Sequence, residues 1–224
     1  MGKMKKIIVL LAFILPACDI DNDEINHYID YFYTPKSISV DVYPTDKNTT
    51  NIDIYLRYNG ESGRDITVKN NNNSDNEPYY KYYGDDYYYK RKLKKGELVS
   101  RLQVHACAFP IRAITITADT DIDELHKTEV CLNDLANLYH FTSYYKIIKN
   151  DFEYPETTVD KLCDCTPEDL CLVDYFIGMK IPTPNVTADT VTYTISIDFD
   201  KDPVTGEEIS VEPVKVKVAY NTAE

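Results

Sequence analysis

Apolar and polar residues alternate along several short stretches of the chain, and this period of two is typical of half-buried β-strands. The clearest alternations lie at residues 38–42 and 52–56, and the second ends before an Asn-Gly turn. The pattern and the breaks between stretches predict strands at residues 37–43, 52–57, 65–69, 98–104, 113–117, 175–181, 191–197 and 211–218. Because short alternating strands dominate, the sequence predicts a mainly β chain with antiparallel pairing.

Two short helices are expected in the connections. In residues 132–139, LNDLANLY, the apolar positions recur at the helical spacing i, i+3, i+4 and i+7. The second helix is expected to begin at Thr166, a suitable cap, with Pro167 at its first position. The predicted fold is therefore an antiparallel β-sandwich, like an immunoglobulin or transthyretin domain, with one or two short helices.

The chain begins with the organisation of an export signal. Three lysines precede an apolar run from Ile7 to Ala17. Its 11 residues are too few for a membrane-spanning helix, which needs about 20. This start therefore reads as a secretory signal. The residues Leu15-Pro16-Ala17-Cys18 resemble the lipobox of bacterial lipoproteins, and the acids at 19–24 resemble the surface-export tag of Bacteroidetes lipoproteins.

This resemblance implies where the mature chain is found. We expect a lipoprotein signal peptide at 1–17, an acidic tether at 18–36 and one domain at 37–224. Cys18 is the expected lipidation site. The implied location is the outer membrane, with the protein lipid-anchored and facing outward at the cell surface.

Net charge limits the partners. The whole chain carries −13, and loss of three lysines with residues 1–17 gives −13 − 3 = −16. A charge of this size repels nucleic-acid phosphates and anionic lipid head groups. We therefore expect no nucleic-acid partner, and membrane contact through the acyl chains on Cys18.

Five cysteines besides Cys18 are the disulfide candidates, because an exported chain occupies an oxidising compartment. They are Cys107, Cys131, Cys163, Cys165 and Cys171. At least one bridge is expected from the 163–171 segment, whether within it or to Cys107 or Cys131, with one thiol left over. A zinc site is the alternative, but the paired C-x₂-C spacing typical of zinc is absent from the sequence. No metal or other cofactor is expected.

A tyrosine-rich stretch is the candidate binding surface. It runs from Tyr79 to Tyr89 and is expected to form a hairpin that turns at Gly84-Asp85. Its members are Tyr79, Tyr80, Tyr82, Tyr83, Tyr87, Tyr88 and Tyr89. Such rings could stack on sugars or bind a protein. The alternative is a solvent-exposed hairpin in which every second tyrosine packs on the domain and covers it.

Three motifs resemble an uncharacterised domain family of Bacteroidetes lipoproteins. They are ITIT at 114–117 with the acidic turn after it, LNDL at 132–135 and IPTP at 181–184. The resemblance covers residues 98–220. It implies a β-rich exported domain with no assigned activity, so no functional residues carry over.

Catalysis is not expected from the sequence. It contains no G-x-S-x-G, H-E-x-x-H or Walker motif. His105 and Cys107 could form a nucleophile pair, but no third group that would orient the base can be identified. We expect a binding or structural lipoprotein. The alternatives are a fimbrial or adhesin subunit, or an accessory protein that captures glycans with the stretch Tyr79–Tyr89.

Overall fold

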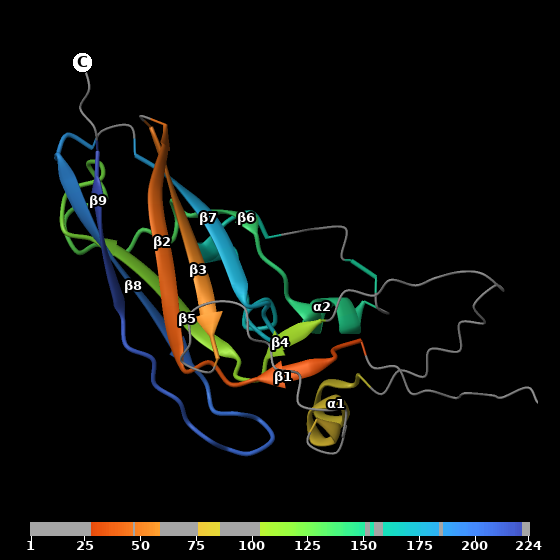
Figure 1. Cartoon of the computed structure of the whole chain (residues 1–224). Helices are drawn as coiled ribbons and strands as arrows, with labels where there is room; N and C mark the ends of the chain where they lie inside the picture. The colour runs from red at the N-terminus through yellow and green to blue at the C-terminus, as the bar shows by residue number, and fades with distance from the viewer. Residues whose placement is uncertain are drawn as a thin grey trace, which may run out of the picture.

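The computed structural model describes residues 28–46, 48–58, 76–85, 104–150, 153–154, 159–183 and 186–220. Within these ranges the chain is mainly β with two short α-helices, which confirms the expected class (Figure 1). The strands are β1 (Tyr31–Tyr33), β2 (Ser37–Asp46), β3 (Thr49–Arg57), β4 (His105–Cys107), β5 (Ile111–Ala118), β6 (Asn137–His140), β7 (Phe176–Pro182), β8 (Thr190–Phe199) and β9 (Val214–Ala219). The helices are α1 (Glu77–Tyr83) and α2 (Tyr144–Lys149).

The strands form two antiparallel sheets and one parallel pair. A four-stranded sheet has the order β2-β3-β7-β6, and a three-stranded sheet behind it in Figure 1 has the order β5-β8-β9. Strands β1 and β4 pair in parallel. The predicted strands at 37–43, 52–57, 113–117, 175–181 and 191–197 are confirmed, and the one at 211–218 is β9, which begins only at residue 214. Residues 65–69 and 98–103, where two further strands were predicted, lie outside the described residues.

One hydrophobic cluster joins the two antiparallel sheets. Alternate residues of each strand point into it, as the period of two requires. The four-stranded sheet contributes Ile52, Ile54, Leu56, Ile177 and Met179, and the three-stranded sheet contributes Ile114, Ile116, Tyr193, Ile195 and Ile197. These side chains are all almost fully buried. The opposite residues of β3 and β7 therefore form the outer face of the four-stranded sheet.

A buried polar link also connects the two sheets. The hydroxyl oxygen of Tyr220, just after β9, lies 2.6 Å from Thr50 Oγ1 and 2.5 Å from Tyr193 Oη. Thr50 belongs to β3 and Tyr193 to β8, and both are fully buried. Buried hydroxyls need such partners, since an unsatisfied one is costly. The link therefore fixes one sheet over the other at this end.

The Tyr79–Tyr83 part of the expected hairpin is a helix, which corrects the prediction. Pro78 lies in the first turn, and Gly84 ends α1 with a left-handed φ of 76°. Both are helix-boundary residues. Tyr80 and Tyr83 share the buried side of α1, at the helical spacing of three.

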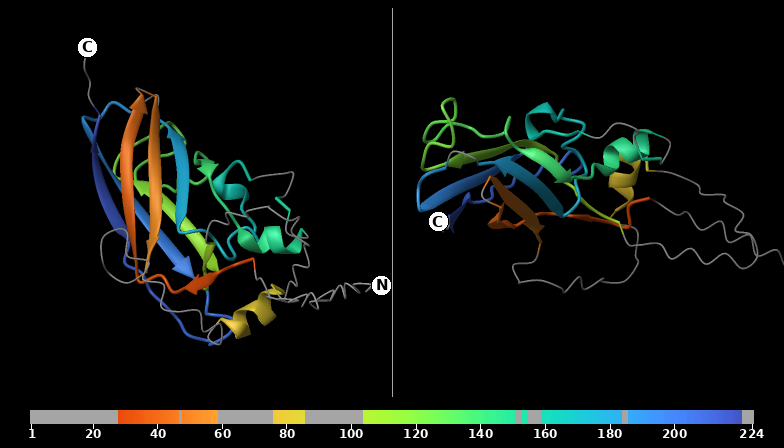
Figure 2. Two further views of the ribbon diagram at one scale, coloured as in Figure 1. Left: turned by 45° about the vertical axis from the view of Figure 1, so that its right-hand side comes forward. Right: turned by 90° about the horizontal axis from the view of Figure 1, so that it is seen from above.

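The helices lie at the same end of the molecule as β1 and β4 (Figure 2). Ile29 is fully buried there, in a second cluster with residues of α1, α2 and β4. The carboxylate of Asp85 accepts hydrogen bonds from the backbone N–H groups of Tyr28 and Ile29, at 2.8 and 2.9 Å. Residues 28–36, expected in the tether, thus belong to the folded domain.

The prediction of a helix at residues 132–139 is wrong. Residues 133–135 form a turn, and residues 137–140 form β6. Leu132 N–H donates to Ile116 O of β5 at 2.9 Å. The Asn133 side chain bonds Ile114 O and Ile116 N–H, at 2.6 and 3.3 Å. This segment therefore pairs along the otherwise open edge of β5, and tertiary pairing overrides its helical spacing.

The helix expected from Thr166 is reduced to a single turn at residues 167–170. Its cap is nevertheless formed: Thr166 Oγ1 accepts the Asp169 N–H at 3.4 Å, and Asp169 Oδ2 in return accepts the Thr166 N–H at 2.8 Å. Within the described residues, no helix has the length and apolar character to cross a bilayer.

Candidate functional site

The outer face of the four-stranded sheet carries aromatic and polar side chains. Strand register arranges them in rows across β2, β3 and β7. The rows are Tyr43–Asn51–Lys180, Asp41–Asp53–Gly178 and Ser39–Tyr55–Phe176. Tyr139 of β6 lies at a register shift between Leu138 and His140, and its ring reaches over the second row. We call this surface the aromatic face, defined by Tyr43, Asp53, Tyr55, Tyr139 and Phe176.

Asp53 is the centre of the aromatic face. Asp53 is only 7% exposed, whereas Tyr43 and Tyr139 beside it are 41% and 44% exposed. Tyr139 donates its hydroxyl to Asp53 Oδ1, and Tyr43 donates to Asp53 Oδ2 at 3.1 Å. Asn51 Nδ2 in turn donates to Tyr43 Oη at 3.3 Å. A buried carboxylate is thus hydrogen-bonded by two partly exposed phenols.

The direction of these hydrogen bonds decides what the surface offers. Each phenol hydrogen is directed inward to Asp53, so each phenol oxygen keeps lone pairs that can accept a hydrogen bond. The Asp53 oxygens themselves are buried, and each already accepts a hydrogen bond from one phenol. The centre of the face therefore presents acceptors beside aromatic rings, and it suits a ligand that supplies hydroxyl donors.

Gly178 makes this arrangement possible. A Cβ at this position would lie 2.6 Å from Tyr139 Cζ and 2.7 Å from Tyr139 Cε2. Atoms cannot approach so closely, so only glycine leaves room for the outer end of the ring. An aromatic ring over a strand glycine also covers backbone that the glycine leaves bare. The glycine thus places Tyr139 within reach of Asp53.

A second aromatic group follows along the strands. Tyr55 and Phe176 stack with ring centroids 5.0 Å apart, and the ring of His140 lies 4.8 Å from that of Phe176. The Arg57 guanidinium lies 4.8 Å from the Tyr55 centroid and also donates to Ser39 Oγ at 2.7 Å. Tyr55 and Phe176 are half-buried, so part of each ring is open to solvent.

Burial and the charges of the face keep the phenols of Tyr139 and Tyr55 protonated. Burial, the hydrogen bond to Asp53 and the Asp53 charge all raise the pKa of Tyr139. Burial and the charges of Asp53 and Asp41 raise the pKa of Tyr55. Lys180 Nζ lies 5.4 Å from the Tyr139 centroid, a cation–π distance. Both flanking cations therefore contact rings of the face.

Of the seven tyrosines predicted as a binding surface, Tyr79, Tyr80 and Tyr83 contribute to packing. Tyr80 and Tyr83 are about 1% exposed, and their burial raises the pKa of Tyr80 to about 12. Tyr79 stacks on Phe32 at 5.0 Å and donates to Asp202 Oδ2 at 2.5 Å. Tyr82 is 60% exposed. Tyr87, Tyr88 and Tyr89 lie outside the described residues.

The predicted disulfides are not formed among the described cysteines, which are all free. Cys107 is buried, Cys165 and Cys171 are half-buried, and Cys131 and Cys163 are exposed. Burial raises the pKa of Cys165 to about 12 and that of Cys171 to about 11. Cys107 Sγ donates to Phe109 O at 3.2 Å, and burial raises its pKa, so it is a protonated core side chain.

Packing supplies the order that a cross-link was expected to give the 163–171 segment. Leu162 and Leu170 are buried in the cluster between the sheets. Lys146 Nζ of α2 lies 2.5 Å from Asp169 Oδ1, and Asp169 is nearly fully buried. Apolar burial and this ion pair replace the bridge. Cys18 lies outside the described residues.

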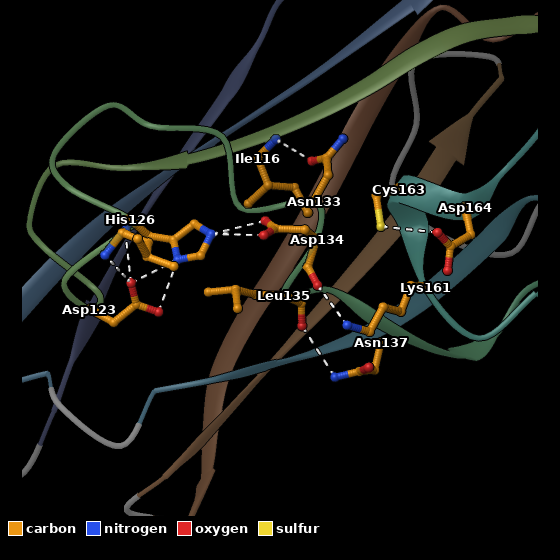
Figure 3. A network of polar contacts seen from close by, with 11 residues as sticks. Ile116, Asp123, His126, Asn133, Asp134, Leu135, Asn137, Lys161, Cys163 and Asp164 are labelled. Atoms are coloured by element: carbon orange, nitrogen blue, oxygen red, sulfur yellow. Dashed lines mark hydrogen bonds and ion pairs between the residues drawn. The ribbon is translucent and has the colours of Figure 1, made fainter.

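A separate polar network lies on the loop between β5 and β6 (Figure 3). The His126 ring lies between two carboxylates, with Nδ1 2.8 Å from Asp123 Oδ1 and Nε2 3.0 Å from Asp134 Oδ1. Burial opposes the imidazolium charge, but the two carboxylates outweigh it and raise the pKa of His126. No group of three metal-ligating side chains with suitable geometry occurs within the described part of the chain. We interpret the network as a structural one that holds this loop in place.

Comparisons with known protein families, with curated proteins and with solved structures find no match to this chain.

The sequence contained one signal for the aromatic face. The alternation in residues 37–43 and 51–57 assigns Tyr43, Asn51, Asp53 and Tyr55 to the side opposite the core. Tyr139 gave no such signal, because its segment had helical spacing. The candidate site therefore became visible only when the register placed β6 and β7 beside β3.

Proposed function

We propose that this protein is an exported, lipid-anchored outer-membrane lipoprotein, facing outward from the cell, that binds carbohydrate on the aromatic face without catalysis. The observation that carries the binding proposal is the carboxylate of Asp53, held by the exposed phenols of Tyr43 and Tyr139. The export and anchor parts rest on the signal at residues 1–18. The proposal keeps a glycan-capturing role and assigns it to the sheet in place of the stretch Tyr79–Tyr89.

Carbohydrate chemistry matches the two components of the face. A sugar ring exposes C–H groups on its faces, and these carry partial positive charge that suits the negative face of an aromatic ring. Its hydroxyl groups point outward from the ring edge and need acceptors and donors. The oxygens of the two phenols, which Asp53 holds in place, provide acceptors, and Lys180 provides donors at the next row.

The exposure of the rings supports a ligand of this kind. Tyr43 and Tyr139 are each more than two-fifths exposed although their hydroxyls are fixed by Asp53. Their positions are therefore set before any ligand arrives, which lowers the entropy lost on binding. A preorganised, partly exposed aromatic surface is typical of recognition rather than of core packing.

We also propose that the two antiparallel sheets form a β-sandwich of the immunoglobulin or transthyretin kind. Its support is the single hydrophobic cluster shared by both sheets and the Thr50–Tyr220–Tyr193 link between them. In such an arrangement one face of each sheet is left outside, and the aromatic face is one of these.

Affinity electrophoresis tests the carbohydrate proposal. The mature protein without its lipid would be run through gels containing soluble neutral polysaccharides: a β-glucan, a mannan, a xylan and an α-glucan. We expect at least one to retard the protein. Tyr139→Ala should abolish the retardation, whereas Tyr82→Ala, which removes an exposed tyrosine of α1, should leave it unchanged. Equal migration of all variants in every gel would refute the proposal.

A further inference from the structure

The ligand class can be narrowed by the layout of the aromatic face, on the basis of the function proposed above. The face has two aromatic groups, one around Asp53 with Tyr43 and Tyr139, and one formed by Tyr55 and Phe176. Both lie on the same side of the same sheet. Their relative position determines the shape of ligand that can contact both.

The two groups succeed each other along the strands. Gly178, under Tyr139, and Phe176 are two residues apart on β7, and Asp53 and Tyr55 are two residues apart on β3. A step of two residues along a strand advances about 7 Å. This step is comparable to the length of one sugar unit. Successive units of a chain can therefore meet the two groups in turn.

The row of Lys180 and Asn51 lies on one side of the Asp53 row, and Arg57 lies beyond the Tyr55 row. From Asn51 to Arg57 the face extends over six residue steps of β3, or about 20 Å. This length accommodates roughly three successive sugar units. The rings lie on the open side of a sheet, so a chain can pass over them in both directions.

Charge argues against an acidic ligand. The chain carries −13, so an anionic polymer is repelled at a distance. The two cations of the face are each placed at an aromatic ring, Arg57 at Tyr55 and Lys180 at Tyr139. Asp41 and Asp53 stand in the row between them. The local balance is two positive and two negative groups, which favours an uncharged ligand.

We infer that the ligand is an uncharged, linear glycan, bound at internal units of its chain and lying along the strands of β3 and β7. The group around Asp53 binds one unit through hydrogen bonds and ring contact. The Tyr55–Phe176 group binds the next unit by stacking. Recognition does not depend on the chain ends.

Titration calorimetry with a length series tests this inference. The probes are oligosaccharides of two to six units prepared from whichever neutral polysaccharide retards the protein. Affinity should rise with length up to about three units and then level off, and reduction of the terminal sugar of the longest oligosaccharide should leave its affinity unchanged. Phe176→Ala should weaken the six-unit ligand roughly tenfold, as expected for one ring contact, and should change the two-unit ligand far less.

Two controls separate the possible outcomes. Tyr139→Ala should weaken ligands of every length, and Tyr82→Ala should weaken none. If affinity is independent of length, or is lost when the terminal sugar is reduced, the protein recognises chain ends and the linear-chain inference is wrong although carbohydrate binding stands. Tighter binding of an acidic polysaccharide, weakened by salt, would overturn the neutral-ligand inference. If no polysaccharide retards the protein, the proposed function itself fails.

Discussion

Gly178→Ala is the most direct test of how the aromatic face is built. The added methyl group would lie 2.6 Å from Tyr139 Cζ, so the Tyr139 ring must move away. Gly178 does not have the positive φ that disfavours other residues, so alanine fits the strand backbone itself. The consequence of the substitution therefore arises at Tyr139 and at the carboxylate of Asp53 that it contacts.

The magnitude follows from the contacts. Displacement of Tyr139 removes a hydrogen bond to the Asp53 carboxylate, and a bond to a charged group contributes about 1.5–3 kcal/mol. Replacing glycine by alanine in a compatible backbone returns about 0.4–1 kcal/mol, because the unfolded chain loses freedom. We therefore expect Gly178→Ala to lower the free energy of unfolding by about 1–2 kcal/mol.

A double-mutant cycle in urea provides the assay. In the Tyr139→Ala background the ring is absent, so the alanine methyl group has room and Gly178→Ala should stabilise the protein by about 0.4–1 kcal/mol. The sign of the substitution thus reverses between the two backgrounds. An equal loss of stability in both would show that Gly178 serves the backbone and not Tyr139, and the reasoning would be wrong.

Three further predictions concern other parts of the chain. The pKa of His126 is raised in the folded protein, so its protonated ring should stabilise the fold. This stabilisation should be complete at pH values below the ordinary histidine pKa of about 6.5, and it should disappear as the pH rises through the raised pKa of the folded protein. The difference in urea midpoint between the native protein and His126→Gln should shrink over this range. A constant difference would contradict the stabilising role of the contacts that His126 makes with Asp123 and Asp134. Tyr220→Phe should cost about 1–2 kcal/mol of unfolding free energy in urea, because the buried hydroxyls of Thr50 and Tyr193 each lose one hydrogen bond. Cys18→Ala should abolish labelling of the protein by a radioactive fatty acid in cells, and persistent labelling would exclude the proposed anchor.

The strands could be predicted because their signal is local. In β3, apolar Ile52, Ile54 and Leu56 alternate with polar neighbours, and burial of one face is enough to explain that pattern. The stretch Tyr79–Tyr83 had no contrast between neighbouring residues, so no period could be read from it. Only Pro78 and Gly84 indicated a helix there.

The errors came from interactions between distant parts of the chain. Residues 132–139 have helical spacing, but Asn133 and Leu132 bond to β5 instead. The aromatic face is assembled in the same way. Tyr139 and Asp53 are separated by 86 positions in the sequence. Local periodicity contains no information on such pairings, so the face could not be located before the strand register was known.

The folded domain already includes Tyr28, only a short stretch after Cys18, and this has a mechanical consequence. Ten residue steps (28 − 18 = 10) separate Cys18 from Tyr28, so with the proposed lipid on Cys18 the domain stays within about 35 Å of its anchor. A ligand held on the sheet while the membrane holds the N-terminus would place the chain under tension. That tension reaches the domain at Asp85, which bonds the N–H groups of residues 28 and 29, and at the β1–β4 pair.

The hydrogen bonds of the parallel β1–β4 pair are evenly spaced and slant between the strands. A pull along β1 therefore loads them together in shear instead of opening them one at a time. With the proposed lipid on Cys18, a pull on the N-terminus would thus be resisted by several hydrogen bonds of this end of the domain at once.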